Sequence, residues 1–188
     1  MNILIINGHQ SHRDSEGRLN RTLTERMVEV LSPANKVAVS ILQEGYDVEE
    51  ERRKFLKADI VIYQTPIYWF SIPGLLKTYM DEVYAHGTFF KSSSRYGAGG
   101  LLVAKRYMFS TTWNAPAEAF GDPDQFFEGE SLDEVLSHLH RVQRYLGMKP
   151  LPSFACFDVV HRPQMEEALQ RLEKHLQLLG EGVVADAC

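Results

Sequence analysis

Short runs of apolar residues alternate along this chain with segments of helical periodicity, and this alternation constrains the fold more than any other feature. Each run is continuous rather than interrupted by polar residues, which is typical of strands buried on both faces. The expected strands span residues 2–7, 36–42, 59–64, 106–112 and 154–160. A β-α order of this kind predicts a parallel sheet with helices on both faces.

Apolar stripes with helical spacing lie between and after these runs. Ser131 begins one stripe with Glu134 three residues later, which is the pattern of a capping box. Gly147 and Gly180 follow the last two stripes, and glycine commonly ends a helix. Pro73 lies where the first turn of another helix is expected.

We therefore expect an α/β fold with a doubly wound, five-stranded parallel sheet in three layers. Five strands favour the flavodoxin-like order 2-1-3-4-5 over a sheet of six strands. The predicted organisation is a single domain over residues 1–180, followed by a loose C-terminal tail over residues 181–188.

The composition argues against several classes of protein. The net charge is −5, so no basic surplus is available to neutralise phosphates, and we expect no nucleic-acid partner. Cys156 and Cys188 are the only cysteines, which excludes a disulfide framework and fits a reducing cytoplasm. No apolar run approaches the roughly 18 residues of a membrane span, and the N-terminus lacks the basic region of a signal peptide. No H-E-x-x-H, G-x-S-x-G or C-x-x-C motif occurs, and we expect no metal site.

Three loops are the candidates for a ligand site. In open α/β sheets, ligands bind beyond the carboxyl ends of the strands, near the point where the strand order reverses. The loops that leave such ends here begin at residues 7, 65 and 112. If the predicted strand order is right, these loops meet in space.

The first loop is polar and leads into a helix. Asp14 and Ser15 are possible N-caps, Gly17 allows close approach of the backbone, and Arg18 adds positive charge. Free N–H groups at the helix start would hold a phosphate, although plain helix capping explains the same residues. The loop matches neither the G-x-G-x-x-G nor the P-loop fingerprint. His9 could touch a ligand, but an ordinary solvated or hydrogen-bonded histidine is the simpler interpretation.

The second loop places three aromatic residues, Tyr68, Trp69 and Phe70, between Pro66 and Pro73. Stiff backbone and flat rings suit a planar heteroaromatic cofactor. The alternative is that Trp69 and Phe70 fill the core beneath the loop.

The third loop carries Thr112, Trp113 and Asn114, with Pro116 at its exit. Its backbone N–H groups could stabilise negative charge on a ligand, although an ordinary turn is the alternative. Residues 95–102 are glycine-rich without the fingerprint spacing, and Tyr96 among them could stack on a flat ring.

Taken together, several stretches resemble the modulator of drug activity B quinone reductases, bacterial relatives of DT-diaphorase in the NAD(P)H dehydrogenase (quinone) group. They are NILIINGH, SEGRLNRTLTE, ADIVIYQTPIYWFSIPGLLKTYMDEVY, YGAGGLL, TWNAP, DQFFEG and LGMKPLP. The likeness runs from residue 2 to about residue 180, and PIYWFSIPGLLK and TWNAPAEAF are its most specific parts. It implies a flavodoxin-like fold, bound FAD, a homodimer, and hydride transfer from NADPH through FAD to a quinone.

The resemblance also implies the residues that bind the cofactor. The FAD pyrophosphate and ribose would be held by Ser15, Glu16, Gly17, Arg18, Leu19, Asn20, Arg21 and Thr22. The isoalloxazine ring would be bordered by Pro66, Ile67, Tyr68, Trp69 and Phe70. The far side of the ring would meet the backbone of Thr112, Trp113, Asn114 and Ala115, and Tyr96 matches a further FAD contact.

The chain departs from DT-diaphorase after the fourth strand. That group has a Tyr and a His there, which help to settle charge on the reduced flavin. The matching stretch AEAFGDPDQFFEGES contains neither, and Phe120 and Glu128 lie near their places. No catalytic side chain is assigned, and we expect backbone N–H groups around Trp113, Asn114 and Ala115 to take that role.

The predicted function is an FAD-dependent oxidoreductase that transfers a hydride from NAD(P)H to quinones by a ping-pong, two-electron mechanism. An FMN-dependent azoreductase or nitroreductase, or a flavodoxin-like electron carrier or binding module, are the alternatives. A homodimer is also expected, because Tyr79, Tyr84, Phe89 and Phe90 look exposed and exposed aromatic residues mark interfaces.

Overall fold

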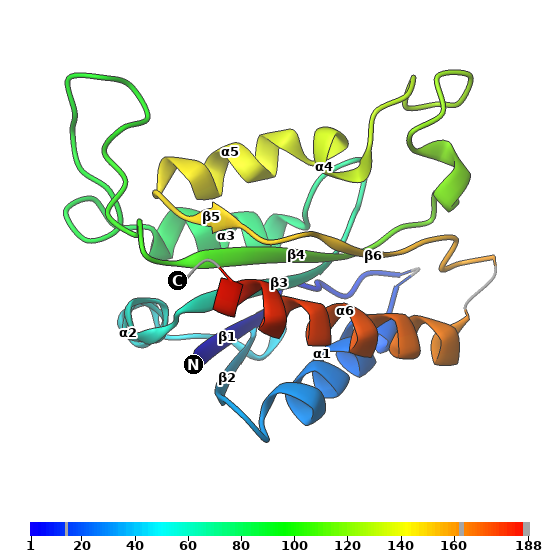
Figure 1. Cartoon of the computed structure of the whole chain (residues 1–188), viewed down its shortest axis with the longest axis horizontal. Coiled ribbons are helices and arrows are strands. Elements are labelled where there is room, and N and C mark those ends of the chain that lie inside the picture. Colours follow the sequence, from blue (N-terminus) through cyan, green and yellow to red (C-terminus); the bar gives the residue numbers. More distant parts are fainter. Residues whose placement is uncertain (14, 162–163, 186–188) are drawn as a thin grey trace.

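The computed structural model describes residues 1–13, 15–161 and 164–185. Figure 1 shows a parallel sheet between two layers of helices. The strands are β1 (Asn2–Asn7), β2 (Lys36–Ile41), β3 (Ile60–Pro66), β4 (Arg106–Thr112), β5 (Lys149–Pro150) and β6 (Phe154–Cys156). The helices are α1 (Arg18–Leu31), α2 (Val48–Lys57), α3 (Gly74–Val83), α4 (Leu132–Val135), α5 (Ser137–Tyr145) and α6 (Met165–Ala185), with short 3-10 turns η1 (Leu42–Glu44) and η2 (Ala117–Ala119).

The strand order is β2-β1-β3-β4-β5, and every pair is parallel, which confirms the predicted topology. The fifth strand was expected over residues 154–160, but it is shorter in the structure, where β6 ends at Cys156, and an unpredicted two-residue strand, β5, precedes it. β5 pairs with the start of β4, and β6 pairs with its end. Pro150 and Pro152 lie at and just after β5, and proline has no N–H group to donate to a ladder, so pairing cannot run unbroken along this edge.

The sheet separates two hydrophobic cores, because successive residues of a strand point to opposite faces. Ile3 and Ile5 of β1 pack on the side covered by α1 and α6. Leu4 and Ile6 pack on the other side, under α2, α3 and α5. This is the three-layer arrangement that the continuous apolar runs predicted.

The helices differ from expectation at two places. The stripe over residues 132–146 forms α4 and α5, separated at Leu136, and the predicted capping box of Ser131 and Glu134 is present. α6 does not end at Gly180 but continues to Ala185, since a glycine inside a helix costs only about 1 kcal/mol relative to alanine. Residues 186–188 lie outside the described residues, so the domain boundary at residue 180 stays a prediction. Within the described ranges, no helix has the combination of length and apolar character needed to cross a membrane.

The expectation that four aromatic residues point outward is wrong for two of them. Tyr79 and Phe89 are completely buried, and the Phe89 ring packs 5.2 Å from that of Phe55. Phe90 is partly buried, with its ring 5.5 Å from that of Tyr145. The chain turns at Gly87, where φ is +83°, and this turn sends the two adjacent phenylalanines into different surroundings.

Candidate functional site

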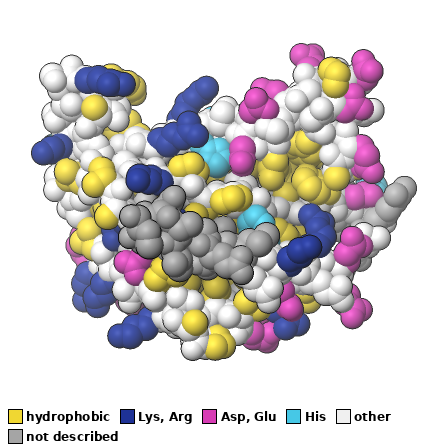
Figure 2. All heavy atoms as spheres, in the orientation of Figure 1, with side chains coloured by type: hydrophobic (Ala, Val, Ile, Leu, Met, Phe, Trp, Pro, Cys, Tyr) yellow, Lys and Arg dark blue, Asp and Glu magenta, His cyan; other side chains and the backbone are white. Residues whose placement is uncertain are grey.

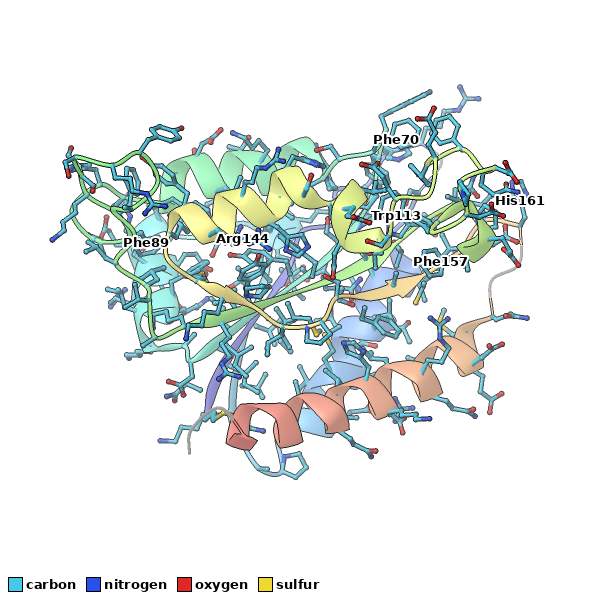
Figure 3. The ribbon with its side chains drawn as sticks, turned by 45° about the horizontal axis from the view of Figure 1, so that its top comes forward. Phe70, Phe89, Trp113, Arg144, Phe157 and His161 are labelled. Atoms are coloured by element: carbon cyan, nitrogen blue, oxygen red, sulfur yellow. The ribbon has the colours of Figure 1, made fainter. Side chains whose placement is uncertain are left out.

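The loops that follow β1, β3 and β4 meet at the carboxyl edge of the sheet, as predicted. The backbone N–H of Ile67 donates to the carbonyl of Thr112 at 3.0 Å, joining the second loop to the third. The hydroxyl of Tyr68 donates to Oγ of Ser15 at 3.0 Å, joining the second loop to the first. Figure 3 shows Phe70, Trp113 and Phe157 at this end of the molecule and Phe89 at the other.

The start of α1 fits an anion. Gly17 is its N-cap with φ of +76°, no side chain caps it, and its first turn carries no acidic residue. The first N–H groups of a helix have no partner inside the helix, so these amides and the positive end of the dipole are available to a phosphate. A Cβ atom at Gly17 would lie 2.3 Å from Nδ1 of His9, so only glycine lets the imidazole lie beneath this turn.

The other predicted residues of the first loop divide into exposed and packed side chains. Glu16 and Arg18 form an exposed ion pair at 2.7 Å, and Arg21 is exposed as well. Leu19 packs against the core between α1 and α6. The hydroxyl of Thr22 donates back to the carbonyl of Arg18 at 3.0 Å. The side chains of Leu19 and Thr22 therefore take part in the helix and its packing and do not face a ligand. The cationic side chains that could bind a phosphate are those of Arg18 and Arg21.

A buried polar network beneath the loops fixes α1 to the sheet. Asn20 donates from Nδ2 to Oγ1 of Thr112 at 3.2 Å and accepts at Oδ1 from Nε2 of Gln64 at 2.8 Å. Ser110 donates to Oε1 of Gln64 at 2.7 Å, and Asn7 donates to Oγ1 of Thr24 at 3.0 Å. All of these residues are buried. This network therefore holds α1 rigidly against the ends of β1, β3 and β4, because satisfied buried networks are rigid.

Sequence reasoning missed Asn7, Gln64 and Ser110 as supports of the site. A signal was available, since each interrupts or ends an otherwise apolar strand. Gln64 and Ser110 are also paired residues in the register of β3 and β4.

The three aromatic residues of the second loop form part of a tight and strained turn. Tyr68 and Ser71 exchange backbone hydrogen bonds of 2.8 and 3.1 Å, and the two residues between them have φ of +49° (Trp69) and +64° (Phe70). Bulky residues in this left-handed region cost about 1–3 kcal/mol each. Trp69 is 94% exposed and Phe70 is 49% exposed, so the alternative that they fill the core is wrong. Such strain, kept to present two large rings to solvent, points to a flat ligand.

Relieving this strain should stabilise the protein. The double variant Trp69→Asn/Phe70→Gly places at the turn the residues that positive φ favours, and we expect the free energy of unfolding in urea to rise by about 1–2 kcal/mol. Phe126→Gly is the matched control, because Phe126 is also exposed but does not have a positive φ. We expect that control to lower stability. A double variant less stable than the wild type would show that the turn is not strained.

An aromatic cluster overhangs the second loop and was not assigned from the sequence. Phe70 stacks on Phe126 with ring centroids 5.5 Å apart, and Phe120 stacks on Phe127 at 4.5 Å. Trp113 meets Phe120 edge-on at 5.2 Å. The segment that carries these phenylalanines, residues 116–131, therefore forms one apolar wall of the site.

The prediction that the backbone N–H of Trp113 is available to a ligand is wrong. Its backbone N–H donates to the carbonyl of Cys156 at 2.8 Å, and its indole N–H donates to Oγ1 of Thr111 at 2.8 Å. The pairing with β6 occupies the backbone, so Trp113 contributes a buried wall rather than a donor. Asn114 is exposed and Ala115 half-buried, and no acceptor for their N–H groups is found among the described residues.

His9 is buried rather than solvated. Its Nε2 lies 3.2 Å from Oγ of Ser15, and its backbone N–H donates to Oδ1 of Asn7 at 3.1 Å. Burial lowers the pKa of His9 below the usual 6.5, although a hydrogen bond that the imidazole donates to Gln43 opposes this, and the nearby His12 and Arg21 lower the pKa further. The imidazole is therefore neutral at pH 7.

Tyr96 is not part of this site within one chain. It is 93% exposed, and its ring lies 5.9 Å from that of Tyr145, just before β5. β5 pairs with the first residues of β4, whereas Thr112 ends that strand. Seven residues at about 3.3 Å each put Tyr96 roughly 20 Å from the loops that follow β1, β3 and β4, because the glycine-rich segment folds against the amino end of the sheet.

A hollow of about 600 Å³ lies beside the first loop. Its lining residues are Gln10, Ser11, Leu42, Gln43, Gly45, Tyr46, Val48, Leu75 and Glu82. The hydroxyl of Tyr46 donates to Oε2 of Glu82 at 2.7 Å, and burial together with this carboxylate raises the pKa of Tyr46 to about 12. The hollow therefore combines apolar walls with side chains that can donate and accept hydrogen bonds.

Comparison with known proteins agrees with this geometry. Residues 1–177 match the family model described as flavodoxin-like fold. The chain is 42% identical to NADPH:quinone oxidoreductase MdaB of Haemophilus influenzae, over 94% of this chain and 98% of that protein. A Klebsiella pneumoniae structure named as a quinone reductase superposes with a TM-score of 0.77 at 25% identity, covering 95% of this chain and 85% of that one. An FMN-dependent NADH-azoreductase from Bacillus anthracis, solved with FMN, shares the fold alone, with a TM-score of 0.69, 18% identity, and 95% and 99% coverage. The chain belongs to the flavodoxin-like family, and within it to the group of the NADPH:quinone oxidoreductase MdaB.

Proposed function

We propose that this protein is an FAD-dependent oxidoreductase that passes a hydride from NADPH to quinones. The observation that carries the proposal is the pairing of an uncapped helix start with two strained, exposed aromatic rings on the adjacent loop. The flavin would supply the hydride chemistry. The amides of Gly17 and Arg18 would hold the phosphate end, and Trp69 and Phe70 would border the ring. We keep the cytoplasm as the proposed location, on the low cysteine content.

The hollow beside the first loop supports FAD over FMN. FMN ends at its phosphate, whereas FAD continues into a second phosphate and an adenosine that need space of their own. The hollow begins at Gln10 and Ser11, in the loop that leads to the start of α1. FMN remains the alternative, because the fold neighbour from Bacillus anthracis binds it as an azoreductase.

The identity of the cofactor tests this proposal directly. Purified protein should be yellow, and mass spectrometry of the compound released by heat should find FAD. Release of FMN alone would support the azoreductase alternative. Failure to bind either flavin on reconstitution would rule out the enzyme and leave a binding module without flavin.

Steady-state kinetics should follow a ping-pong pattern. A single flat slot beside Trp69 and Phe70 would hold a nicotinamide or a quinone in turn, so NADP+ would have to leave before the quinone enters. Double-reciprocal plots at several quinone concentrations should therefore be parallel. Intersecting lines would indicate a ternary complex. We expect NADPH to be preferred over NADH, as the name of the Haemophilus relative suggests.

A homodimer is part of the proposal, on new grounds. Residues 85–106, which include Tyr96, contain basic but no acidic residues, and residues 107–140 contain acidic but no Lys or Arg residues. The basic set is Lys91, Arg95, Lys105 and Arg106, and the acidic set is Glu118, Asp122, Asp124, Glu128, Glu130, Asp133 and Glu134. Figure 2 shows acidic side chains around an apolar patch at upper right, and Lys and Arg side chains at upper left.

Opposite charges at opposite ends suit a two-fold dimer, in which each basic segment contacts the acidic segment of the partner. Such a pairing would also bring Tyr96 to the partner's flavin loops, where the resemblance expects it.

Light scattering at micromolar concentration should give about twice 21.5 kDa. The variant Lys91→Glu/Arg95→Glu should dissociate more readily, because it opposes like charges. Combining it with Asp122→Lys/Asp124→Lys should restore the dimer, because opposite charges again face each other. The change in the acidic segment alone should weaken the dimer. A wild-type monomer with full activity would contradict the proposal.

A further inference from the structure

A chain of side-chain hydrogen bonds connects the loop that borders the ring to the loop that precedes α1. The hydroxyl of Tyr68 lies 3.0 Å from Oγ of Ser15, which in turn lies 3.2 Å from Nε2 of His9. The Tyr68 ring also meets the ring of His12 edge-on, with centroids 4.8 Å apart. Both of these partners of Tyr68, Ser15 and His12, therefore come from the first loop.

Tyr68 is the donor in its bond to Ser15. Burial raises the pKa of Tyr68, so its phenol stays a donor. His9 is neutral at pH 7, because burial lowers its pKa. Oγ of Ser15 accepts from Tyr68 and also lies within hydrogen-bond distance of Nε2 of His9. Ser15 therefore links Tyr68 to His9.

The histidine at the end of the chain is held firmly. His9 is 6% exposed, its backbone N–H is bonded to Asn7, and its imidazole fills the space next to Gly17 that a side chain would occupy. The strained turn of Trp69 and Phe70 follows Tyr68 directly. The hydroxyl of Tyr68 therefore ties a strained, exposed turn to the rigid base of α1.

We propose that Tyr68 is a positioning residue, which orients the turn of Trp69 and Phe70 relative to the start of α1 through its bond to Ser15. This assigns to Tyr68 a role different from direct contact with the flavin ring. It rests on the proposed function, and it makes the ring end of the site depend on a residue of the phosphate end.

Riboflavin distinguishes positioning from contact, because it has the flavin ring but no phosphate. Tyr68→Phe keeps the ring beside His12 and removes only the hydroxyl, and Ser15→Ala removes the other half of the bond. If Tyr68 positions the turn, both variants should weaken riboflavin binding to the flavin-free protein by roughly three- to ten-fold, the size of one lost hydrogen bond. The double variant should bind riboflavin as tightly as the single variant with the lower affinity, since both changes break the same bond.

Two further measurements separate this role from a general loss of stability. At saturating riboflavin, the visible circular dichroism of the bound ring should change in the same way in both single variants. Tyr84→Phe is the matched control, because its hydroxyl is bonded to that of Tyr63 at 2.8 Å on the packed α3 side of the sheet, away from these loops. It also loses a hydrogen bond, and we expect its riboflavin affinity and spectrum to match the wild type.

The outcomes are distinct. Weaker binding in Tyr68→Phe with unchanged binding in Ser15→Ala would mean that the hydroxyl of Tyr68 touches the ring directly, which overturns the positioning role alone. Unchanged binding in both variants would overturn it as well. A wild-type protein that binds none of riboflavin, FMN and FAD would overturn the proposed function, and the positioning role with it.

Discussion

Replacing Glu51 by alanine should lower the free energy of unfolding by about 3–5 kcal/mol. Glu51 is 1% exposed, and its carboxylate accepts hydrogen bonds from Ser40 at 2.7 Å, Tyr79 at 2.8 Å and Lys54 at 2.6 Å. These groups come from β2, α2 and α3, so one carboxylate joins three elements. Its removal leaves two buried hydroxyls and an ammonium without their acceptor, and such groups are costly when unsatisfied. A loss of this size is a large part of the 5–15 kcal/mol typical of a domain.

The preceding residue in the same helix is the control. Glu50 also faces Lys54, at 3.6 Å, but its side chain is 57% exposed. Glu50→Ala should therefore change stability by no more than about 0.5 kcal/mol. Urea unfolding of both variants checks the contrast, and Glu51→Gln, which keeps an acceptor, should fall between them. Equal small losses for Glu50→Ala and Glu51→Ala would show that the buried carboxylate is not structurally important.

Replacing Gly17 by alanine should nearly abolish flavin binding. Alanine at φ of +76° is strained, and its Cβ would lie 2.3 Å from the imidazole of His9. Either the imidazole or the first turn of α1 must move, and the amides that we propose hold the phosphate move with the turn. Losing two hydrogen bonds to a charged group costs about 3 kcal/mol or more, so we expect FMN to bind about 100-fold more weakly.

Gly87→Ala separates the clash from the backbone strain. Gly87 has a similar φ of +83°, but an added Cβ would meet nothing within 4 Å. This variant should lose a little stability and keep its affinity for FMN, measured by titration of the flavin-free protein. If the two variants bind FMN equally well, the space beneath Gly17 does not matter and the phosphate lies elsewhere.

The apolar runs determined the framework of the fold without help from tertiary structure. β1 and β4 begin and end where the continuous runs do, and β2 and β3 differ by a residue or two. A strand buried on both faces cannot carry regular polar residues, so this pattern is local and legible. Parallel strands then bring their carboxyl ends to one edge, which is why the meeting of the three loops could be inferred.

Distant partners and burial decided the rest. Asn20 donates a hydrogen bond to Thr112, which is 92 residues away in the sequence. Both N–H groups of Trp113 donate hydrogen bonds, to Cys156 and Thr111. No local sequence pattern indicates these bonds. Trp69 and Phe70 look apolar in sequence, yet a strained turn exposes them. The resemblance placed Tyr96 at the site, but its ring lies near Tyr145, at the other end of the sheet. The sequence by itself determined the first four strands and the edge of the sheet at which the three loops meet. Only the tertiary structure decided which side chains face that edge, because exposure and hydrogen-bond partners depend on segments far apart in the chain.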